Sequence, residues 1–171
     1  MNDSAAAHTQ AERTVIDSFD EEFARLHARA CSLINTTPDE VLYRDPNTTT
    51  GDATFPSIGE CVLRSAGAVE QTFGGITSNL WDDPFEWTLP ETLSTRALIV
   101  EYLTEVEQTR KHAFGCFVGD SDLLKKIATP SGEMHPLINL LQDTLVRAVG
   151  YQGRAFAIRG TLSKNSPAEY H

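Results

Sequence analysis

The chain is short of cysteine pairs, of basic charge and of long apolar runs, and each shortage excludes a class of protein. Three of the 171 residues are cysteines, and no two form a CxxC pair, which excludes a structural zinc site of that type. The chain has 14 lysines and arginines against 24 aspartates and glutamates, for a net charge of −10. Nucleic acid requires a basic surface and is therefore not an expected partner. No apolar run approaches the roughly 20 residues of a membrane-spanning helix.

The cysteines and the first residues predict a cytoplasmic location. Cys31, Cys61 and Cys116 are odd in number and widely spaced, a usage typical of reduced thiols. The opening sequence MNDSAAAHTQAER is polar and lacks the basic start, apolar core and cleavage pattern of a secretory signal. We therefore expect a cytoplasmic protein that does not associate with a membrane.

Four amphipathic segments dominate what the sequence does contain. In each, apolar residues recur at steps of three and four, which places them on one face of an α-helix and does not suit a strand. The four stripes are Ile16, Phe19, Phe23, Leu26, Ala30 and Leu33; Ile58, Val62, Ala66, Val69, Phe73, Ile76 and Leu80; Leu98, Tyr102, Val106, Thr109, Ala113 and Phe117; and Leu137, Leu141, Leu145, Ala148, Gln152 and Ala155, with Phe156 alongside.

The stripes predict an all-α, up-down four-helix bundle. A chain of 171 residues suits one domain with a sizeable core, so we assign residues 1–171 to a single domain with loose tails at 1–10 and 162–171. Ser57 followed by Glu60 is a capping box and marks the start of the second helix. The expected helices lie near residues 12–35, 57–80, 95–117 and 136–160.

The connection between the second and third helices is long and aromatic. Trp81, Phe85 and Trp87 lie within ten residues, and large aromatic side chains seldom remain exposed. They either cover the core between these helices or form a dimer contact or a pocket lid. The carboxylates Asp82, Asp83 and Glu86 are interpreted as solvated turn residues, with metal ligation as the alternative.

The second helix also contains three glycines, each of which costs about 1 kcal/mol relative to alanine in a helix. Gly67, Gly74 and Gly75 indicate either close helix approach or a kink near the last two. The functional alternative is that they leave room for a ligand.

Three segments, at residues 57–70, 98–103 and 135–154, resemble those of the DinB/YfiT-like bundle family. They read SIGECVLRSAGAVE, LIVEYL and HPLINLLQDTLVRAVGYQGR, and the likeness spans nearly the whole chain. The resemblance implies a four-helix bundle, frequent pairing into homodimers, and one divalent metal such as zinc or nickel held by three histidines. One of these histidines lies on the second helix and two lie on the last. For some relatives it implies transfer of a low-molecular-weight thiol to an electrophile.

All three of the family's histidine positions are substituted in this chain. They match Arg64 on the second helix and Arg147 and Tyr151 on the last. Arginine has no lone pair to offer a metal, and tyrosine alone is a poor site for zinc or nickel. We therefore expect a protein without a metal cofactor that acts in small-molecule binding or protein interaction. The alternative is a metal-dependent thiol S-transferase, so the question of enzymatic activity stays open.

The candidate pocket consists of Arg64, Arg147, Tyr151 and Cys61. Arg147 and Tyr151 are four residues apart and share a helix face, where Arg147 either binds an anionic ligand or forms a structural ion pair. The resemblance predicts that Arg64 lies at the pocket, whereas helical periodicity predicts that it faces solvent. Cys61 is either a small buried hydrophobe or a thiol activated by neighbouring arginines. In a metal-free enzyme, Arg147 would hold the anion while Tyr151 or Cys61 reacted.

Two histidines leave a rebuilt metal site open. His27 and His112 lie on different predicted helices, each beside its own stripe. Together with carboxylates they are the residues from which such a site would be assembled. The default interpretation is two ordinary surface or hydrogen-bonded histidines.

We also expect a homodimer. The resemblance implies one, and the aromatic connector adds apolar surface. Apolar residues outside the main stripes would form the rest of a symmetric patch. These residues are Leu63, Ile99, Leu103, Ile138 and Val149.

Overall fold

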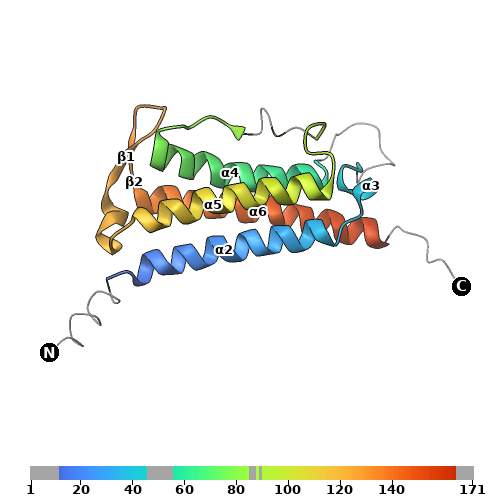
Figure 1. Cartoon of the computed structure of the whole chain (residues 1–171), viewed down its shortest axis with the longest axis horizontal. Coiled ribbons are helices and arrows are strands. Elements are labelled where there is room, and N and C mark those ends of the chain that lie inside the picture. The colour runs from blue at the N-terminus through green and yellow to red at the C-terminus, as the bar shows by residue number, and fades with distance from the viewer. Residues whose placement is uncertain (1–11, 46–55, 85–87, 89, 165–171) are drawn as a thin grey trace, which may run out of the picture.

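The computed structural model describes residues 12–45, 56–84, 88 and 90–164, and four long helices lie side by side in it (Figure 1). The prediction of a mainly helical protein is confirmed, and the predicted helix boundaries agree to within a few residues. The last helix continues to Lys164, so residues 162–164 are helical although the sequence predicts a loose tail from residue 162. The long helices are α2 (Thr14–Asn35), α4 (Ile58–Ser78), α5 (Arg96–Cys116) and α6 (Leu137–Lys164), and the short elements are α3 (Asp39–Leu42), the 3-10 helix η2 (Asp120–Leu124), β1 (Lys126–Ala128) and β2 (Met134–Pro136).

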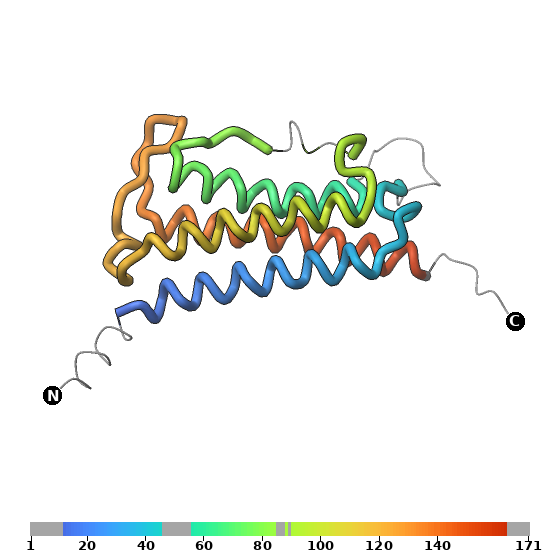
Figure 2. The backbone as a smooth tube through the Cα atoms, viewed as in Figure 1, coloured from blue at the N-terminus to red at the C-terminus, as the bar shows by residue number. Residues whose placement is uncertain are grey.

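The order of helix directions differs from the predicted up-down alternation. The connector after α4 runs back along the bundle, so α5 starts at the same end as α4 and the two are parallel (Figure 2). Contacts agree with this direction, because Tyr102 near the start of α5 bonds to Glu70 and Phe114 near its end packs on Phe73. The topology is therefore up, down, down, up, with α2 and α6 parallel to each other.

A small antiparallel hairpin closes one end of the bundle. Ile127 pairs with His135 at its centre, and the Leu137 amide donates to the Lys125 carbonyl at 2.9 Å, which leads the chain into α6. The 3-10 helix η2 comes directly before β1 and links the end of α5 to the hairpin.

Local signals fix the ends of α4. The capping box is present, because the Glu60 amide donates to Ser57 Oγ and the Glu60 carboxylate accepts from the Ser57 amide at 2.7 Å. Asn79 ends the helix in the left-handed conformation with φ 55°, which asparagine tolerates better than most residues. Both features are local and explain why the boundaries were predictable.

The core follows most of the predicted stripes. Phe23, Phe73 and Phe114 from α2, α4 and α5 meet at its centre, with ring centroids 5.1–6.0 Å apart. Three predicted core positions are wrong: Leu80 is 61% exposed, Leu98 is 38% exposed and Phe156 is 44% exposed. On α5, Tyr102, Val106 and Ala113 are buried as predicted, but Ile99 and Leu103 also occupy the core and Leu98 does not.

Helix α4 is buried on almost every side because it contacts α6, α5 and the returning connector. Its glycines allow aromatic rings to approach closely. A Cβ on Gly75 would lie 2.4 Å from the Trp81 ring, and one on Gly59 would lie 2.5 Å from the Tyr43 ring. Close approach, rather than room for a ligand, therefore explains Gly75, and Trp81 packs on α4. Phe85, Trp87 and Glu86 lie outside the described residues.

Within the part of the chain that the structure describes, no helix is both long enough and apolar enough to cross a membrane.

Candidate functional site

Three of the four residues predicted to form a pocket meet at one polar cavity between α4 and α6. Arg64 on α4 and Arg147 and Tyr151 on α6 line it, and its volume is about 80 Å³. The remaining lining residues are Ala68, Gln71 and Asp83. The site therefore combines residues from two helices and from the connector.

Two buried hydrogen bonds between α4 and α6 set the register that brings these residues together. Ser65 Oγ donates to the Ala148 carbonyl at 3.0 Å, and the Thr72 and Thr144 hydroxyls are 2.6 Å apart. The two helices are antiparallel, and these bonds align residues 65–72 of α4 with residues 144–148 of α6, next to the cavity. Buried hydroxyl pairs of this kind are costly to leave unmatched, and they define one alignment of the two helices.

Arg147 is bonded through Gln71 to the connector. Its Nη2 donates to Gln71 Oε1 at 3.2 Å, and Gln71 Nε2 donates to the Trp81 carbonyl at 2.9 Å. The relay holds the connector against α4 and fixes the rim of the cavity. Arg147 is exposed, so most of its five N–H donors face the cavity or solvent.

Arg64 shows how the conflict between periodicity and resemblance is resolved. It lies away from the apolar stripe, as its helical angle indicates, yet it is only partly exposed and lines the cavity. The reason is that α4 has neighbours on several sides, so a position off the stripe faces α6 and the connector instead of solvent.

Arg154 is a neighbour of the site that the pocket prediction omitted. Its guanidinium carbon lies 5.7 Å from the centroid of the Tyr151 ring, in cation–π contact. It follows Tyr151 by three residues, so helical spacing alone predicts this proximity. With Arg64 and Arg147 it makes this side of the bundle locally basic in a chain of net charge −10.

Cys61 does not line the cavity, contrary to the prediction. Its side chain is fully buried in the core. Burial raises the pKa of the thiol, and this outweighs the opposite influence of Arg154 and Arg64. A buried, protonated thiol is a weak nucleophile, so the structure favours the small-hydrophobe interpretation.

The two histidines considered for a rebuilt metal site are separated. His27 lies beside Cys31 on α2, with Nε2 3.6 Å from Sγ, and burial lowers the pKa of its imidazole. His112 instead borders a cavity of about 320 Å³ at the hairpin end of the bundle. Among the residues that the structure describes, no three His, Cys, Asp or Glu side chains are grouped as a metal site would need.

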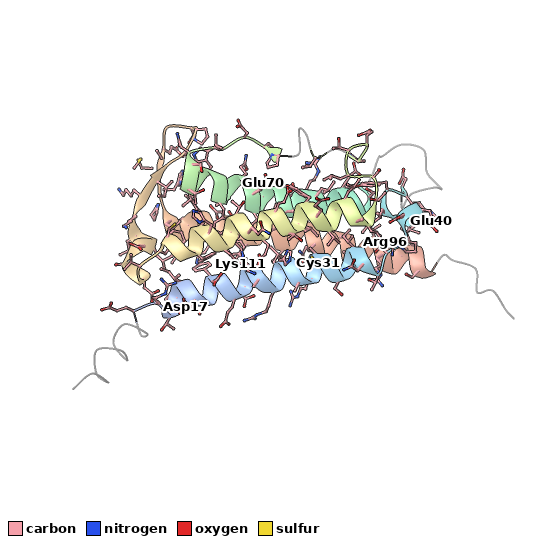
Figure 3. All side chains as sticks on the ribbon, viewed as in Figure 1. Asp17, Cys31, Glu40, Glu70, Arg96 and Lys111 are labelled. Carbon is pink, nitrogen blue, oxygen red and sulfur yellow. The ribbon has the colours of Figure 1, made fainter. Side chains whose placement is uncertain are left out.

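Two further polar clusters were not predicted from the sequence, and both involve α5. Arg110 is almost fully buried and bonds to Glu107 and Asp20. Tyr102 Oη donates to Glu70 Oε2 at 2.5 Å beside a cavity of about 270 Å³ (Glu70 is labelled in Figure 3). Arg110 follows Val106 by four residues, so helical spacing places it on the buried face of α5. A stripe of apolar residues does not include an arginine and therefore misses it.

No protein-family model, curated protein or solved structure matches this chain.

Within the α4–α6 cavity, the chemistry of the lining is that of recognition. Two guanidiniums and a phenol can donate to oxygen atoms, while Asp83 and Gln71 can accept. A nucleophilic mechanism would also need an activated nucleophile beside a base, and Cys61 is displaced into the core. The arrangement is suited to holding a small polar molecule.

Proposed function

We propose that this protein is a DinB-like bundle that works without a metal and binds a small anion in the α4–α6 cavity. The observation that carries the proposal is the convergence of Arg64, Arg147 and Tyr151 on one polar cavity. These are the positions at which the resemblance implies metal ligands. Substituting two of them by arginine exchanges a cation site for donors that suit an oxyanion.

The lining sets the size and charge of the ligand. A cavity of about 80 Å³ accommodates a group of a few atoms, such as a carboxylate or a phosphate, with the rest of the molecule extending into solvent. Arg64 and Arg147 supply positive charge, and Asp83 offsets part of it. A singly charged carboxylate therefore fits this balance better than a doubly charged anion.

The test is a titration of the ¹⁵N-labelled protein with acetate, followed through backbone amide shifts. We expect shifts near residues 64–71 and 147–154. Arg147→Met should raise the Kd about tenfold, the loss expected for one charge-assisted hydrogen bond. Arg29→Met, which removes an exposed charge from α2, is the matched control. Equal Kd values for the two variants would refute the proposal.

Elemental analysis separates this function from the thiol-transferase alternative. That alternative needs a divalent metal to deprotonate the thiol substrate. We expect no stoichiometric zinc or nickel in protein purified without chelator. Stoichiometric metal that is lost in a Tyr151→Phe variant would favour the transferase.

We also infer that two chains pair through the outer face of α6, which keeps only Val149 of the predicted patch. Leu63, Ile99 and Leu103 are buried in the chain's own core and cannot join such a patch. The face of α6 opposite the core is instead apolar or small at helical spacing, and it is exposed. Its residues are Val146, Val149, Gly150, Gly153, Phe156 and Ala157. A two-fold pair would bury this stripe against its own copy.

A further inference from the structure

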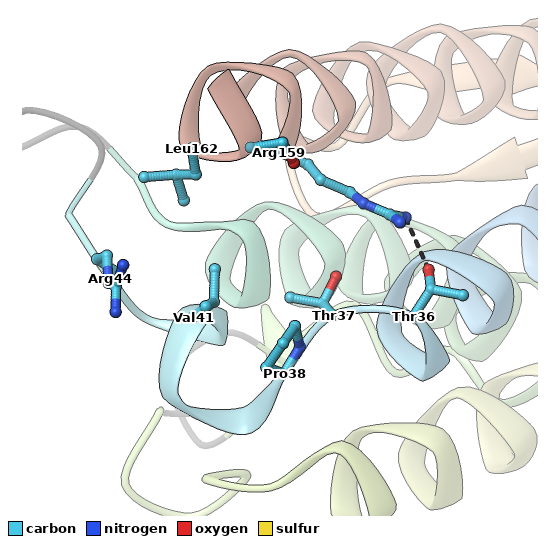
Figure 4. Close-up of a pocket in the computed structure, with 8 residues that line it drawn as sticks. Thr36, Thr37, Pro38, Val41, Arg44, Arg159 and Leu162 are labelled. Carbon is cyan, nitrogen blue, oxygen red and sulfur yellow. Dashed lines mark hydrogen bonds between the residues drawn. The ribbon is translucent and has the colours of Figure 1, made fainter. Parts of the chain in front are cut away.

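Another cavity lies at the far end of the bundle from the hairpin, between the end of α2, α3 and the last turns of α6 (Figure 4). Its volume is about 220 Å³, below the roughly 300–1,000 Å³ of pockets for drug-sized ligands. The lining residues are Thr36, Thr37, Pro38, Val41, Arg44, Arg159, Leu162 and Ser163.

Two arginines line this cavity, and none of the described residues lining it is a carboxylate. Arg159 Nη1 donates to Thr36 Oγ1 at 2.7 Å, which leaves its other N–H groups for a further acceptor. The Arg44 side chain forms no hydrogen bond or ion pair with the described residues. In a chain with 24 acidic residues against 14 basic ones, two guanidiniums at one cavity without an acidic lining residue form a local basic site.

The backbone around both arginines is well anchored. Tyr43 Oη donates to the Leu93 carbonyl at 2.5 Å and its ring lies on Gly59, so the residue that precedes Arg44 is fixed. Arg159 projects from α6 onto the end of α2, where it offsets the partial negative charge of the last carbonyls. That structural role accounts for Arg159 but gives no reason for Arg44.

Part of the cavity lining is apolar. Pro38, Val41 and Leu162 supply it, and Val41 and Leu162 are partly buried. The Ser163 hydroxyl adds a donor at the rim. A pocket lined by both guanidiniums and hydrocarbon suits an organic anion, because inorganic phosphate would bind the arginines but make no use of the apolar side chains.

We propose that this cavity binds a small organic anion, a carboxylate or phosphate monoester with a short apolar body, held between Arg44 and Arg159. The site is separate from the α4–α6 cavity and does not depend on the function proposed for it. Phosphate esters and carboxylates share the chemistry of a planar or tetrahedral oxyanion that guanidiniums bind.

The experiment is an amide-shift titration with three probes at constant ionic strength: phenyl phosphate, inorganic phosphate and benzyl alcohol. We expect phenyl phosphate to shift residues 36–44 and 159–163 with a Kd at least fivefold below that of inorganic phosphate. Benzyl alcohol, which has the body without the charge, should not bind measurably. Butyrate in a fourth titration distinguishes a carboxylate preference from a phosphate preference.

Two variants decide the assignment. Arg44→Met and Arg159→Met should each raise the Kd for phenyl phosphate about tenfold, whereas Arg29→Met should not change it. Arg159→Met also removes a bond to α2, but Arg44 makes no side-chain bond with the described residues, so its variant tests binding without disturbing the fold. Shifts confined to residues 64–71 and 147–154, or equal Kd values for Arg44→Met and Arg29→Met, would overturn the proposal. An absence of binding at this site would leave the α4–α6 site untouched.

Discussion

Arg110 is a charged side chain that is almost fully buried in the core. Its side chain is 2% exposed, and Nε and Nη2 donate to the two oxygens of Glu107 at 2.7 and 2.8 Å. Nη1 donates to the Asp20 carboxylate, and the guanidinium lies 5.4 Å from the centre of the Phe114 ring. A buried guanidinium is tolerated only when its donors are paired in this way.

Removing this charge tests its importance directly. Arg110→Met should lower the free energy of unfolding by about 3–5 kcal/mol, since it removes both hydrogen bonds to the buried Glu107 carboxylate and leaves that group, among the described residues, with only the exposed Lys111 at 3.5 Å. Arg25→Met is the control, because Arg25 forms only exposed ion pairs with Glu21 and Glu22 and should cost less than about 1 kcal/mol. Urea denaturation measures both, and equal losses would contradict this account of Arg110.

Glu70 gives a prediction about pH. Burial raises the pKa of its carboxyl above the ordinary 4.5; the Tyr102 hydrogen bond opposes this and the Glu105 charge adds to it. The folded state therefore holds this proton more tightly than the unfolded chain. The resulting stabilisation is complete below pH 4.5 and is lost as pH rises through the folded-state pKa.

Glu70→Gln should remove the pH-dependent part of the stability that comes from Glu70, because the amide does not ionise. The stability of the variant relative to the unmodified protein should rise between pH 4 and pH 7. Glu40→Gln, at an exposed position of α3, is the reference. Denaturant midpoints measured across this pH range check the trend. If the midpoints of Glu70→Gln and of the unmodified protein change with pH in parallel, the prediction is wrong.

Helix α4 has the most enclosed position of the four long helices. It contacts α6 along its length and α5 on another side, and the returning connector lies over what would otherwise be its solvent face. Gly75 sits beneath the Trp81 ring, where a Cβ would lie 2.4 Å from ring atoms. The connector and the helix are therefore fitted to each other at this point.

Adding one methyl group at Gly75 should push the connector away from α4. Gly75→Ala should destabilise the protein by about 1–3 kcal/mol through overpacking, despite alanine's helix advantage of about 1 kcal/mol. Gly115→Ala, with nothing within 4 Å of the added carbon, should instead be neutral or stabilising. Thermal unfolding compares the two variants, and a red shift of tryptophan emission in Gly75→Ala would report displacement of Trp81. A stabilised Gly75→Ala variant would exclude tight packing here.

The elements were predictable from sequence because their signals are local, and the helix arrangement was not. The Ser57 capping box and the four stripes locate the helices. A stripe identifies the buried face of a helix but does not show which other helix packs against it. Leu63 and Ile99 were therefore assigned to an outer patch although both lie in the core. The parallel α4–α5 pair depends on the path of the connector, which carries no periodic signal.

The candidate site was predicted in part for the same reason. Arg147 and Tyr151 share a helix face at four-residue spacing, so their proximity is readable from sequence. Their meeting with Arg64 depends on the register of α4 against α6, which the buried Thr72–Thr144 contact sets. Asp83 joins the cavity only because the connector folds back. Such contacts between distant residues have no local sequence signal.

At the scale of the whole molecule, the outer face of α6 predicts the oligomeric state. Light scattering at physiological salt should give about twice the 18.8 kDa chain mass. Val149→Asp places a charge in the middle of the exposed stripe and should yield monomers, because a buried unpaired carboxylate costs several kcal/mol. Val15→Asp, at an exposed position of α2, should leave the mass unchanged. A monomeric unmodified protein would remove the basis for pairing.

The parallel direction of α2 and α6 has a mechanical consequence. Gln152 Nε2 donates to the Leu26 carbonyl at 2.8 Å, and Arg159 bonds to Thr36 further along the pair. A force applied between the start of α2 and the end of α6 would slide the helices along each other instead of peeling them apart. Contacts distributed over about 30 Å of helix would then resist together, so we expect a higher rupture force in this geometry than with handles at the starts of α2 and α6, which would peel the two helices apart. Optical tweezers with the two attachment geometries would measure the difference.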